Sequence, residues 1–528
     1  MRRAVFSRAP MPLMRGLLVA TTLLGALDLI AAGCSLGNVH HDDCTTDAQC
    51  GAVFGVGSTC ADGFCSDAAT CTTGHDCRKA AGGGACVAGA CQAAFPIDAA
   101  CKGIVEPPDL LKGPLVGAGA PLIIGGIFSL DEPKNKAIVT AIRLGVQDIN
   151  RSGGMNGGQK LGVVFCDNGG PGNKATGDDR IPLNNHALDY LAGTLGVPVI
   201  VGPLTSSDSI RLINRLKEKA YPTVIISPSA TSPDLTSVDD RLHASDKYGL
   251  FWRTCPSDLL QGKVLAESVV PKTMTSKIAV VYLKDTYGEG LATVFRTAYS
   301  LNQSEGFPFL DTDLADPTKL DAIAAKVNTY GPDGVVVIAL QGGDAIKVLT
   351  SMAGQPTVAS KPFFFTDGAK DQAALLNPML PMGVQAIIKG AVGTEPASPS
   401  GPNYDLFKTN LTTLGLDASG FSFLAQAYDA TFIGAMGVVL ASKTSTKYDG
   451  LNVADGLAHL SAGKAVNLAP TEWQSGIGVL KSAGQINVEG TSGKLDFDAT
   501  TGEAPGKIEL WKASADFTSF VTTPIPGQ

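Results

Sequence analysis

From about residue 121 onward, short apolar runs alternate with stretches whose apolar residues recur at helical spacing. The first run, 122–130 (LIIGGIFSL), is followed by an amphipathic stretch at 137–149. Similar short runs lie at 161–165, 199–201, 224–226 and 250–252, and a second series occupies 278–283, 334–340 and 363–365. Near-continuous apolar strands that alternate with helices are typical of parallel sheets covered on both faces. The pattern therefore predicts two α/β lobes.

The residues that follow these strands carry the candidate chemistry, because ligands of open α/β sheets bind beyond the carboxyl ends of the strands. In the first series these are two small, hydroxyl-rich turns, 202–207 (GPLTSS) and 227–233 (SPSATSP). Their backbone N–H groups and hydroxyls suit a carboxylate. In the second series, Tyr287 offers a flat apolar face and Asp367 a charge that suits an ammonium. Together they predict a cleft that holds a zwitterion.

Each of these residues also has a simpler explanation. A Ser or Thr after a strand is usually a helix cap, so Ser206 and Thr231 taken alone favour that role. Tyr287 alone fits the edge of a core, and Asp367-Gly368 fits an ordinary turn. Their common position at the ends of strands, in two lobes, favours the binding interpretation.

Seven motifs in order resemble the type I periplasmic binding proteins, in particular the leucine/isoleucine/valine-binding subunits of amino-acid ABC importers. They are GGIFSL, DINRSGGMNG, VPVIVGPLTSS, ISPSATSPDLT, FWRTCPSDLLQG, VVYLKDTYGEGLA and AQAYDAT, within about 121–515. The resemblance implies two hinged Rossmann-like lobes that bind an amino acid or its amide and act with an ABC permease, without enzymatic activity or a cofactor. It places the ligand carboxylate on four residues: Ser206, Ser229, Ala230 and Thr231. Tyr287 would pack on the ligand, and Asp367 would take its ammonium.

Two departures from the family pattern leave the ligand open. The family's aromatic residue near Leu340 is missing, and its PLTG turn after the first strand is replaced by 129–132 (SLDE).

The resemblance also gives the expected domain organisation of the chain. It is a signal peptide (1–33), a cysteine-rich module (34–100), a linker (101–120), lobe 1 (121–255), lobe 2 (256–390), lobe 1 continued (391–505), and lobe 2 continued with a tail (506–528).

The N-terminus has the features of an export signal. Four arginines precede an apolar run at 16–30, which is too short to span a bilayer comfortably, and small residues follow it. Cys34 comes directly after them and resembles the lipid-modified cysteine of a bacterial lipobox. The alternative is an ordinary secretory signal in which Cys34 remains a thiol or disulfide partner. Either way we expect an exported protein at the periplasmic face or cell surface, with any membrane contact made by the lipid anchor alone.

A cysteine pattern repeats between residues 44 and 91. Cys44, Cys50, Cys60 and Cys65 are followed by Cys71, Cys77, Cys86 and Cys91, with closely matching gaps and a Cys-Thr-Thr start in both repeats. Few large apolar residues lie here, so the spacing predicts two disulfides in each repeat. Zinc is the competing interpretation, but these gaps fit zinc fingers poorly. We expect a spacer or docking module.

The remaining cysteines can be assigned if lobe 1 has the strand order 2-1-3-4-5. Cys166 then ends the edge strand and Cys255 follows the strand at the far side, several spacings of ~4.8 Å away. Cys101 lies on the arm that leads into the first strand, beside the edge strand. The prediction is a Cys101–Cys166 disulfide, with Cys255 free or paired with Cys34 or another molecule.

Composition excludes some function classes. The 528 residues carry 41 basic and 49 acidic side chains, a net charge of −8, which argues against nucleic acid as a partner. The six histidines show no helix-spaced pair, so no metal site is expected. The alternatives to a transport subunit are a ligand-sensing lobe that signals to a membrane partner and, remotely, a hydrolase, for which no Gly-x-Ser-x-Gly motif is present.

Overall fold

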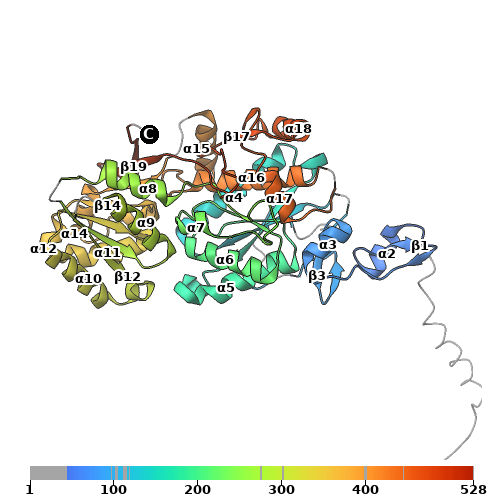
Figure 1. Ribbon diagram of the computed structural model, residues 1–528, viewed down its shortest axis with the longest axis horizontal. Helices are drawn as coiled ribbons and strands as arrows, with labels where there is room; N and C mark the ends of the chain where they lie inside the picture. Colours follow the sequence, from blue (N-terminus) through green and yellow to red (C-terminus); the bar gives the residue numbers. More distant parts are fainter. Residues whose placement is uncertain are drawn as a thin grey trace, which may run out of the picture. The chain divides into compact units, whose positions relative to one another are not determined.

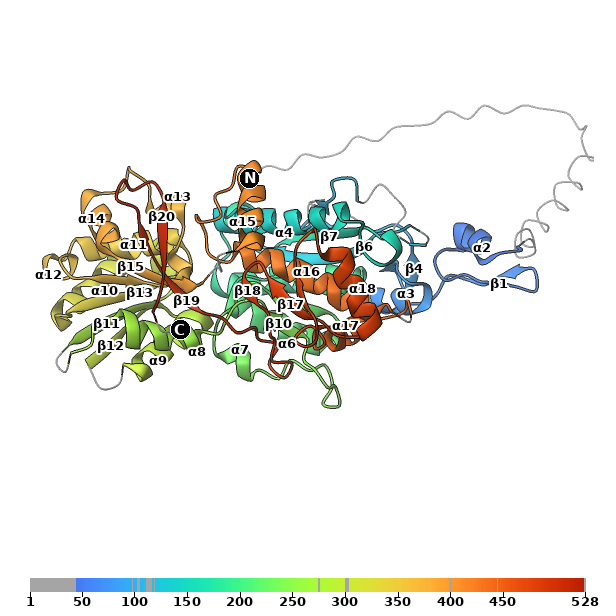
Figure 2. The same ribbon diagram turned by 90° about the horizontal axis from the view of Figure 1, so that it is seen from above.

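The computed structural model describes residues 44–96, 98–101, 105–110, 116–117, 119–273, 276–299, 303–397, 401–443 and 445–526. The expected signal peptide and Cys34 lie outside these residues. The described chain forms two compact units, one of residues 44–54 together with 58–67, and one of 55–57 together with the described residues from 68 onward. The elements of the larger unit are seen from two directions in Figures 1 and 2.

The first cysteine repeat belongs to the small unit. It consists of helix α2 (Asp47–Phe54) and a hairpin of β1 (Cys60–Ala61) and β2 (Phe64–Cys65). Disulfides join Cys44 to Cys60 and Cys50 to Cys65. The cross-links therefore do the work of a core in a segment with few large apolar side chains.

The second repeat has the same design but belongs to the large unit. Helix α3 (Gly74–Ala81) precedes a hairpin of β3 (Ala85–Val87) and β4 (Ala90–Gln92). Its disulfides are Cys71–Cys86 and Cys77–Cys91. The two disulfides that the spacing predicts in each repeat are thus present, and they occupy the sulfurs that zinc would need.

Helix α3 packs tightly against lobe 1. His75 Nε2 lies 2.9 Å from Thr223 Oγ1, and Arg78 Nε donates to the Gly196 carbonyl at 3.2 Å. A Cβ atom at Gly74 would lie only 2.4 Å from the Gly196 nitrogen, so this contact requires glycine. Burial lowers the pKa of His75 to about 3, which keeps the ring neutral at the interface. The second repeat is therefore part of the surface of lobe 1 and not a free spacer.

The sheet of lobe 1 has the order β10-β9-β8-β6-β7-β5. Its parallel strands are β6 (Leu122–Phe128), β7 (Leu161–Asp167), β8 (Val199–Val201), β9 (Val224–Ser227) and β10 (Phe251–Arg253). In chain order this is the predicted 2-1-3-4-5 arrangement. The short strand β5 (Val105–Glu106) adds antiparallel pairing at the edge of β7. The expected linker at 101–120 therefore contributes to the sheet, and β7 is not its edge strand.

A long apolar helix, α16 (Leu424–Ala441), packs beside α4 (Pro133–Arg151) in the core of lobe 1. A Cβ at Gly145 of α4 would lie 3.1 Å from Thr431 of α16, so these helices approach closely. In the described part of the chain, α16 alone is long and apolar enough to cross a membrane, but it is almost entirely buried within the protein. Its composition, which the sequence analysis passed over, is that of a core helix.

Lobe 2 contains a sheet with the order β12-β11-β13-β14-β15-β19-β20. The strands β11 (Lys277–Leu283), β12 (Gln303–Phe309), β13 (Gly334–Ile338), β14 (Phe363–Phe365) and β15 (Val392–Pro396) are parallel. Strand β19 (Ile508–Ala513) pairs antiparallel with β15, and β20 (Phe520–Pro524) pairs antiparallel with β19. Alternate residues of β11 and β13 enter two different cores, one on each face. Helices α8 (Asp258–Val264) and α9 (Thr286–Ala298) cover one face, and α10 (Pro317–Tyr330), α11 (Gly342–Ala353) and α14 (Met382–Gly390) cover the other.

The observed topology corrects one expected boundary. Residues 392–396 pair within the sheet of lobe 2, so the chain returns to lobe 1 after β15 and not at residue 391. It crosses between the lobes after β10, after β15 and before β19, and these crossings form the hinge.

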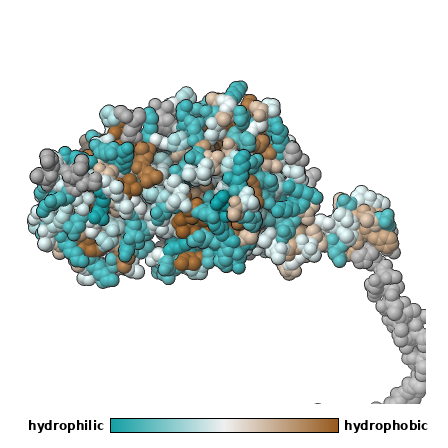
Figure 3. Space-filling view, in the orientation of Figure 1, coloured by the Kyte–Doolittle hydropathy of each residue, from teal (hydrophilic) through white to brown (hydrophobic). Residues whose placement is uncertain are grey.

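On the face seen in Figure 3 the surface is mostly hydrophilic, with separate hydrophobic patches.

The structure contains the Cys101–Cys166 disulfide, which ties the arm before β6 to β7. Cys255 is a buried free thiol just after β10. Burial raises its pKa, so the unreactive thiol form prevails at neutral pH. This cysteine is therefore poorly suited to act as a nucleophile.

Candidate functional site

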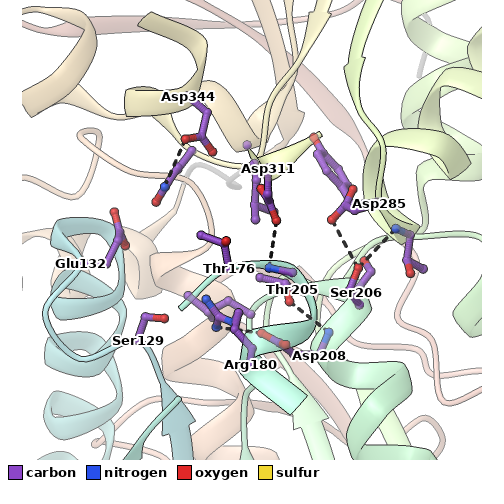
Figure 4. Close-up of a pocket in the computed structure, with 18 of the residues that line it drawn as sticks. Ser129, Glu132, Thr176, Arg180, Thr205, Ser206, Asp208, Asp285, Asp311 and Asp344 are labelled. Carbon is purple, nitrogen blue, oxygen red and sulfur yellow. Dashed lines mark hydrogen bonds and ion pairs between the residues drawn. The ribbon is translucent and has the colours of Figure 1, made fainter. Parts of the chain in front are cut away.

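A cavity of about 920 Å³ lies between the two lobes, at the carboxyl ends of their strands. Residues of lobe 1 form one wall, and residues at the starts of α9, η8 (Asp367–Ala369) and α11 form the other. Figure 4 shows the two walls, with Glu132, Arg180 and Ser206 on one side and Asp285, Asp311 and Asp344 on the other. Of the six predicted ligand residues, four line this cavity. They are Ser206, Ser229, Tyr287 and Asp367.

The turn after β8 leads into helix α6 (Ser206–Lys219), whose start faces the cavity. Thr205 caps this helix, and its hydroxyl accepts from the Asp208 backbone N–H at 3.1 Å. Ser206 is buried, and its Oγ accepts from the Ser232 N–H at 3.2 Å. The hydroxyl of Ser206 therefore joins two turns of lobe 1, while the first-turn N–H groups of a helix of this length are left for caps or ligands.

The turn after β9 is held by a contact inside lobe 1 and by a contact with the start of α8. Ser229 Oγ donates to the Leu204 carbonyl at 2.8 Å. Thr231 Oγ1 donates to Asp258 Oδ2 at 2.9 Å. Ala230 and Thr231 are buried and do not line the cavity. Their predicted contact with a ligand carboxylate therefore finds no support in this conformation and stays a prediction.

On the opposite wall, Tyr287 and Asp367 come together at the ends of β11 and β14. The hydroxyls of Tyr287 and Thr366 share a hydrogen bond of 2.8 Å, and the Tyr287 hydroxyl also donates to Asp367 Oδ1 at 3.1 Å. Asp367 is only 3% exposed. Burial raises the pKa of its carboxyl, whereas Lys134 and the donors around it lower the pKa. An added positive group at this carboxylate would be favoured for the same reason.

The turn that carries Asp367 is supported by a buried ion pair. Lys370 Nζ and Glu395 Oε1 form this pair, and Ser422 Oγ donates to the other Glu395 oxygen at 2.6 Å. Ser422 also lies 3.4 Å from the Asp367 carbonyl oxygen, to which it donates. Phe423, the next residue in the chain, also lines the cavity, and its backbone φ is 73°. The segment before α16 thus fixes the floor of the site.

Eight further carboxyl groups line the cavity, none of which the sequence pattern selected as a ligand residue, and four of them have a raised pKa. Burial raises the pKa of Asp285 to about 6 and that of Asp344 to about 6, and it raises the pKa of Asp311 and Glu132 as well. Asp285 lies two residues before the YGEG motif and caps α9, because its side chain accepts from the Gly288 N–H at 2.8 Å. Asp344 lies in the first turn of α11, Asp311 begins a short 3₁₀ helix, and Glu132 ends the 129–132 segment.

Two of these acids also join the lobes. Ser207 Oγ donates to Asp285 Oδ2 at 3.3 Å, and the Gly177 N–H donates to Asp311 Oδ2 at 3.1 Å. A third contact runs from Ser232 Oγ to the Thr286 carbonyl at 2.9 Å. Hydrogen bonds between lobes at the rim of a cavity are suited to holding a closed conformation.

The chain matches the family described as "Receptor family ligand binding region" over residues 137–516. It is similar to Leu/Ile/Val-binding protein homolog 3 of Brucella melitensis, at 28% identity over 222 residues, which cover 42% of this chain and 52% of that protein. The chain therefore spans about half the length of that relative. Leu/Ile/Val-binding protein BraC3 of Rhizobium johnstonii is 26% identical over 332 residues, covering 62% of this chain and 68% of that protein.

Among solved structures, the leucine binding protein LivK of Thermotoga maritima has a TM-score of 0.56 at 16% identity, covering 77% of this chain and 99% of that one. At this identity the likeness shows the shared fold alone. The family match, in contrast, extends through both lobes and over more than half of the sequence. The chain therefore belongs to the receptor-family ligand-binding proteins, with the type I periplasmic binding fold.

Proposed function

We propose that this protein is an exported solute-binding protein that captures an amino acid or a similar small polar molecule for an ABC importer. The observation that carries the proposal is the cavity of about 920 Å³ between two hinged lobes, with Tyr287 and Asp367 on one wall and the start of α6 on the other. Pockets between hinged domains are the usual place for small ligands. The Leu/Ile/Val-binding relatives support the amino-acid class.

In this proposal the two ends of the ligand meet different walls. The ammonium pairs with Asp367, whose desolvated carboxyl group gains most from an added positive charge. The side chain packs against Tyr287. The acid end faces the start of α6, where Ser206 and Ser229 hold the turns in place through hydrogen bonds within lobe 1.

Export and anchoring belong to the same proposal. The five disulfides of the described chain are typical of proteins that fold in an oxidising compartment. We infer that residues 1–33 are removed as a signal peptide and that Cys34 carries the lipid. Mass spectrometry of the mature N-terminus tests this inference, and an unmodified Cys34 would contradict the anchor.

The central experiment is a thermal-shift screen of the mature protein with amino acids, their amides, sugars and short peptides. We expect the melting temperature to rise with at least one amino acid, because a ligand that binds only the folded state stabilises it. Asp367→Asn should abolish this rise for amino acids.

The matched control is Asp321→Asn, which removes an exposed carboxylate on α10 of the same lobe. This variant should respond to the amino acid like the wild type. The absence of any shift in the wild type, or an Asp367→Asn protein that responds normally, would contradict the proposed function.

A second candidate is a sensor that transmits ligand binding to a membrane partner. It is favoured by the first cysteine repeat, which precedes the binding lobes in the sequence and forms a compact unit of its own. A permease gene beside this one would support the importer, and a kinase gene would support the sensor.

A further inference from the structure

Lys134 is a buried cation on the lobe 1 wall of the cavity. It is the second residue of α4, it lines the cavity, and it is only 7% exposed. Its Nζ lies 5.5 Å from the centre of the Phe423 ring. Among the residues that the structure describes, no carboxylate lies within 4.0 Å of this Nζ. A buried ammonium without an ion-pair partner is unfavourable, so its position indicates an anion that the protein does not supply.

The carboxyl groups around Lys134 are engaged elsewhere. Glu132 caps α4, where its Oε2 accepts from the Asn135 N–H at 2.7 Å. Asp367 accepts from Tyr287. Both feel the charge of Lys134, which lowers their pKa values, but neither forms an ion pair with it. Lys134 therefore makes the electrostatic potential of the cavity more positive, while its ammonium group forms no hydrogen bond with either acid.

The guanidinium groups of Arg180 and Arg211 also line the lobe 1 wall, but both pair with Asp208. Lys174, a further cation of this wall, is exposed. The hydroxyls of Ser206 and Ser229 bond within lobe 1, and that of Thr231 donates to Asp258 at the start of α8. Strands β6 and β8 are neighbours in the sheet, so the helices that follow them, α4 and α6, begin at the same edge. An acid group at the start of α6 is therefore on the side of the cavity from which Lys134 approaches.

We propose that Lys134 is a specificity-determining residue that binds the acid group of the ligand. This inference rests on the proposed function and narrows it. A ligand must carry a free carboxylate for Lys134 as well as an ammonium for Asp367, so the cavity takes amino acids and rejects their amides. The ligand carboxylate thereby pairs with the buried Lys134 of lobe 1, and the ligand ammonium pairs with the buried Asp367 of lobe 2. Both pairs form only when the lobes close on the ligand.

The test compares acids with their amides by isothermal titration calorimetry. The probes are L-leucine with L-leucinamide, and L-alanine with L-alaninamide, which differ only in the acid group. We expect the wild type to prefer the acid of a pair. Lys134→Met should weaken binding of that acid by about 10- to 100-fold, as expected for the loss of a charge-assisted bond, and change binding of the amide by less than about threefold.

Lys136→Met is the matched control, because Lys136 is exposed two residues further along α4. It should behave like the wild type, and Lys134→Arg should keep the preference for the acid. If Lys134→Met does not fold, Lys134→Gln takes its place. Equal losses for acid and amide, or no loss at all, would overturn the assignment of Lys134 while the proposed function stands. A wild-type protein that binds none of the four probes would overturn both.

Discussion

The two walls of the cavity are built on different principles. On lobe 1, the hydroxyls that follow the strands bond to backbone groups of the neighbouring turn or, for Thr231, to Asp258, so these hydroxyls are bonded before a ligand arrives. On lobe 2, Asp285, Asp344 and Asp367 are desolvated carboxyl groups, and burial raises the pKa of each. The lobe 1 wall is a frame of hydroxyls that are already bonded. The lobe 2 wall carries buried carboxyl groups whose ionised form is unfavourable, and a cationic group beside them would stabilise that form.

This difference teaches where ligand discrimination lies. A frame whose hydroxyls are already bonded gains little from a ligand, whereas a buried acid gains much from an ammonium. Lys134 and Glu132 are the exceptions on the lobe 1 side, since both are buried ionisable groups like the acids opposite. The comparison therefore predicts that changes on lobe 2 act on charge and binding, and that changes of the lobe 1 hydroxyls act on stability.

The largest expected effect concerns Asp285. Its pKa rises from 3.8 to about 6 in the folded protein, mainly because of burial, with smaller contributions from Asp311 and Asp208. Between about pH 4 and pH 6 the folded state binds more protons than the unfolded state, so this group lowers stability as pH rises and has no further effect above about pH 7. The shift corresponds to about 3 kcal/mol.

Asp285→Asn keeps a cap for α9 but cannot ionise. We expect its free energy of unfolding to equal that of the wild type near pH 4 and to exceed it by about 3 kcal/mol at pH 7. Urea denaturation at the two pH values measures the difference, with Asp321→Asn as the exposed control. If the difference in free energy of unfolding between Asp285→Asn and the wild type does not change with pH, burial does not disfavour the ionised Asp285 carboxyl in the folded state.

The next effect in size concerns the turn beneath Asp367. A Cβ atom at Gly368 would lie 2.2 Å from the Ala339 carbonyl oxygen, so Gly368→Ala forces the turn away from β13. We expect a loss of about 2 kcal/mol in stability, as is usual for overpacking, and weaker amino-acid binding because Asp367 moves. At Gly343 of α11 a Cβ meets nothing within 4 Å, so Gly343→Ala is the control. Equal thermal stability of the two variants would contradict this account.

Sequence alone predicted the parts of this site that depend on local pattern. The strands around Tyr287 and Asp367 are short apolar runs, and both residues were found because they follow such strands. The buried strand β6 and the helix after it were likewise evident. The edge strand β12 was missed, because its polar residues alternate with only a few apolar ones and half of it is exposed.

What the sequence did not predict depends on packing between distant segments. Asp311 and Asp344 reach the cavity from segments that no motif marks, and Lys134 packs beside the ring of Phe423, almost 300 positions later. The two cysteine repeats make the same point. Their spacing predicts their disulfides, but only the second carries a glycine placed to fit against Gly196, so identical patterns have different surroundings.

A smaller effect distinguishes the role of the Tyr287 hydroxyl. Tyr287→Phe removes its bonds to Thr366 and Asp367, and we expect a loss of about 1.5 kcal/mol in stability. Amino-acid affinity should fall several-fold, since the acid is then held less firmly. Tyr282→Phe, on β11 of the same lobe and half-buried, should change neither property. Normal affinity in Tyr287→Phe would mean that the position of Asp367 does not depend on this hydroxyl.

The smallest effect tests the frame itself. Ser206→Ala leaves the Ser232 N–H without its acceptor, which should cost about 1 kcal/mol of stability. If the lobe 1 hydroxyls only hold the turns, amino-acid affinity measured by calorimetry should stay within about twofold, and Ser475→Ala, an exposed serine on α18 (Trp473–Ala483), should change nothing. A strong loss of affinity at unchanged stability would mean that Ser206 turns its hydroxyl to the ligand. The lobe 1 wall would then act by direct contact, as the family resemblance implies, and the contrast between the walls would be lost.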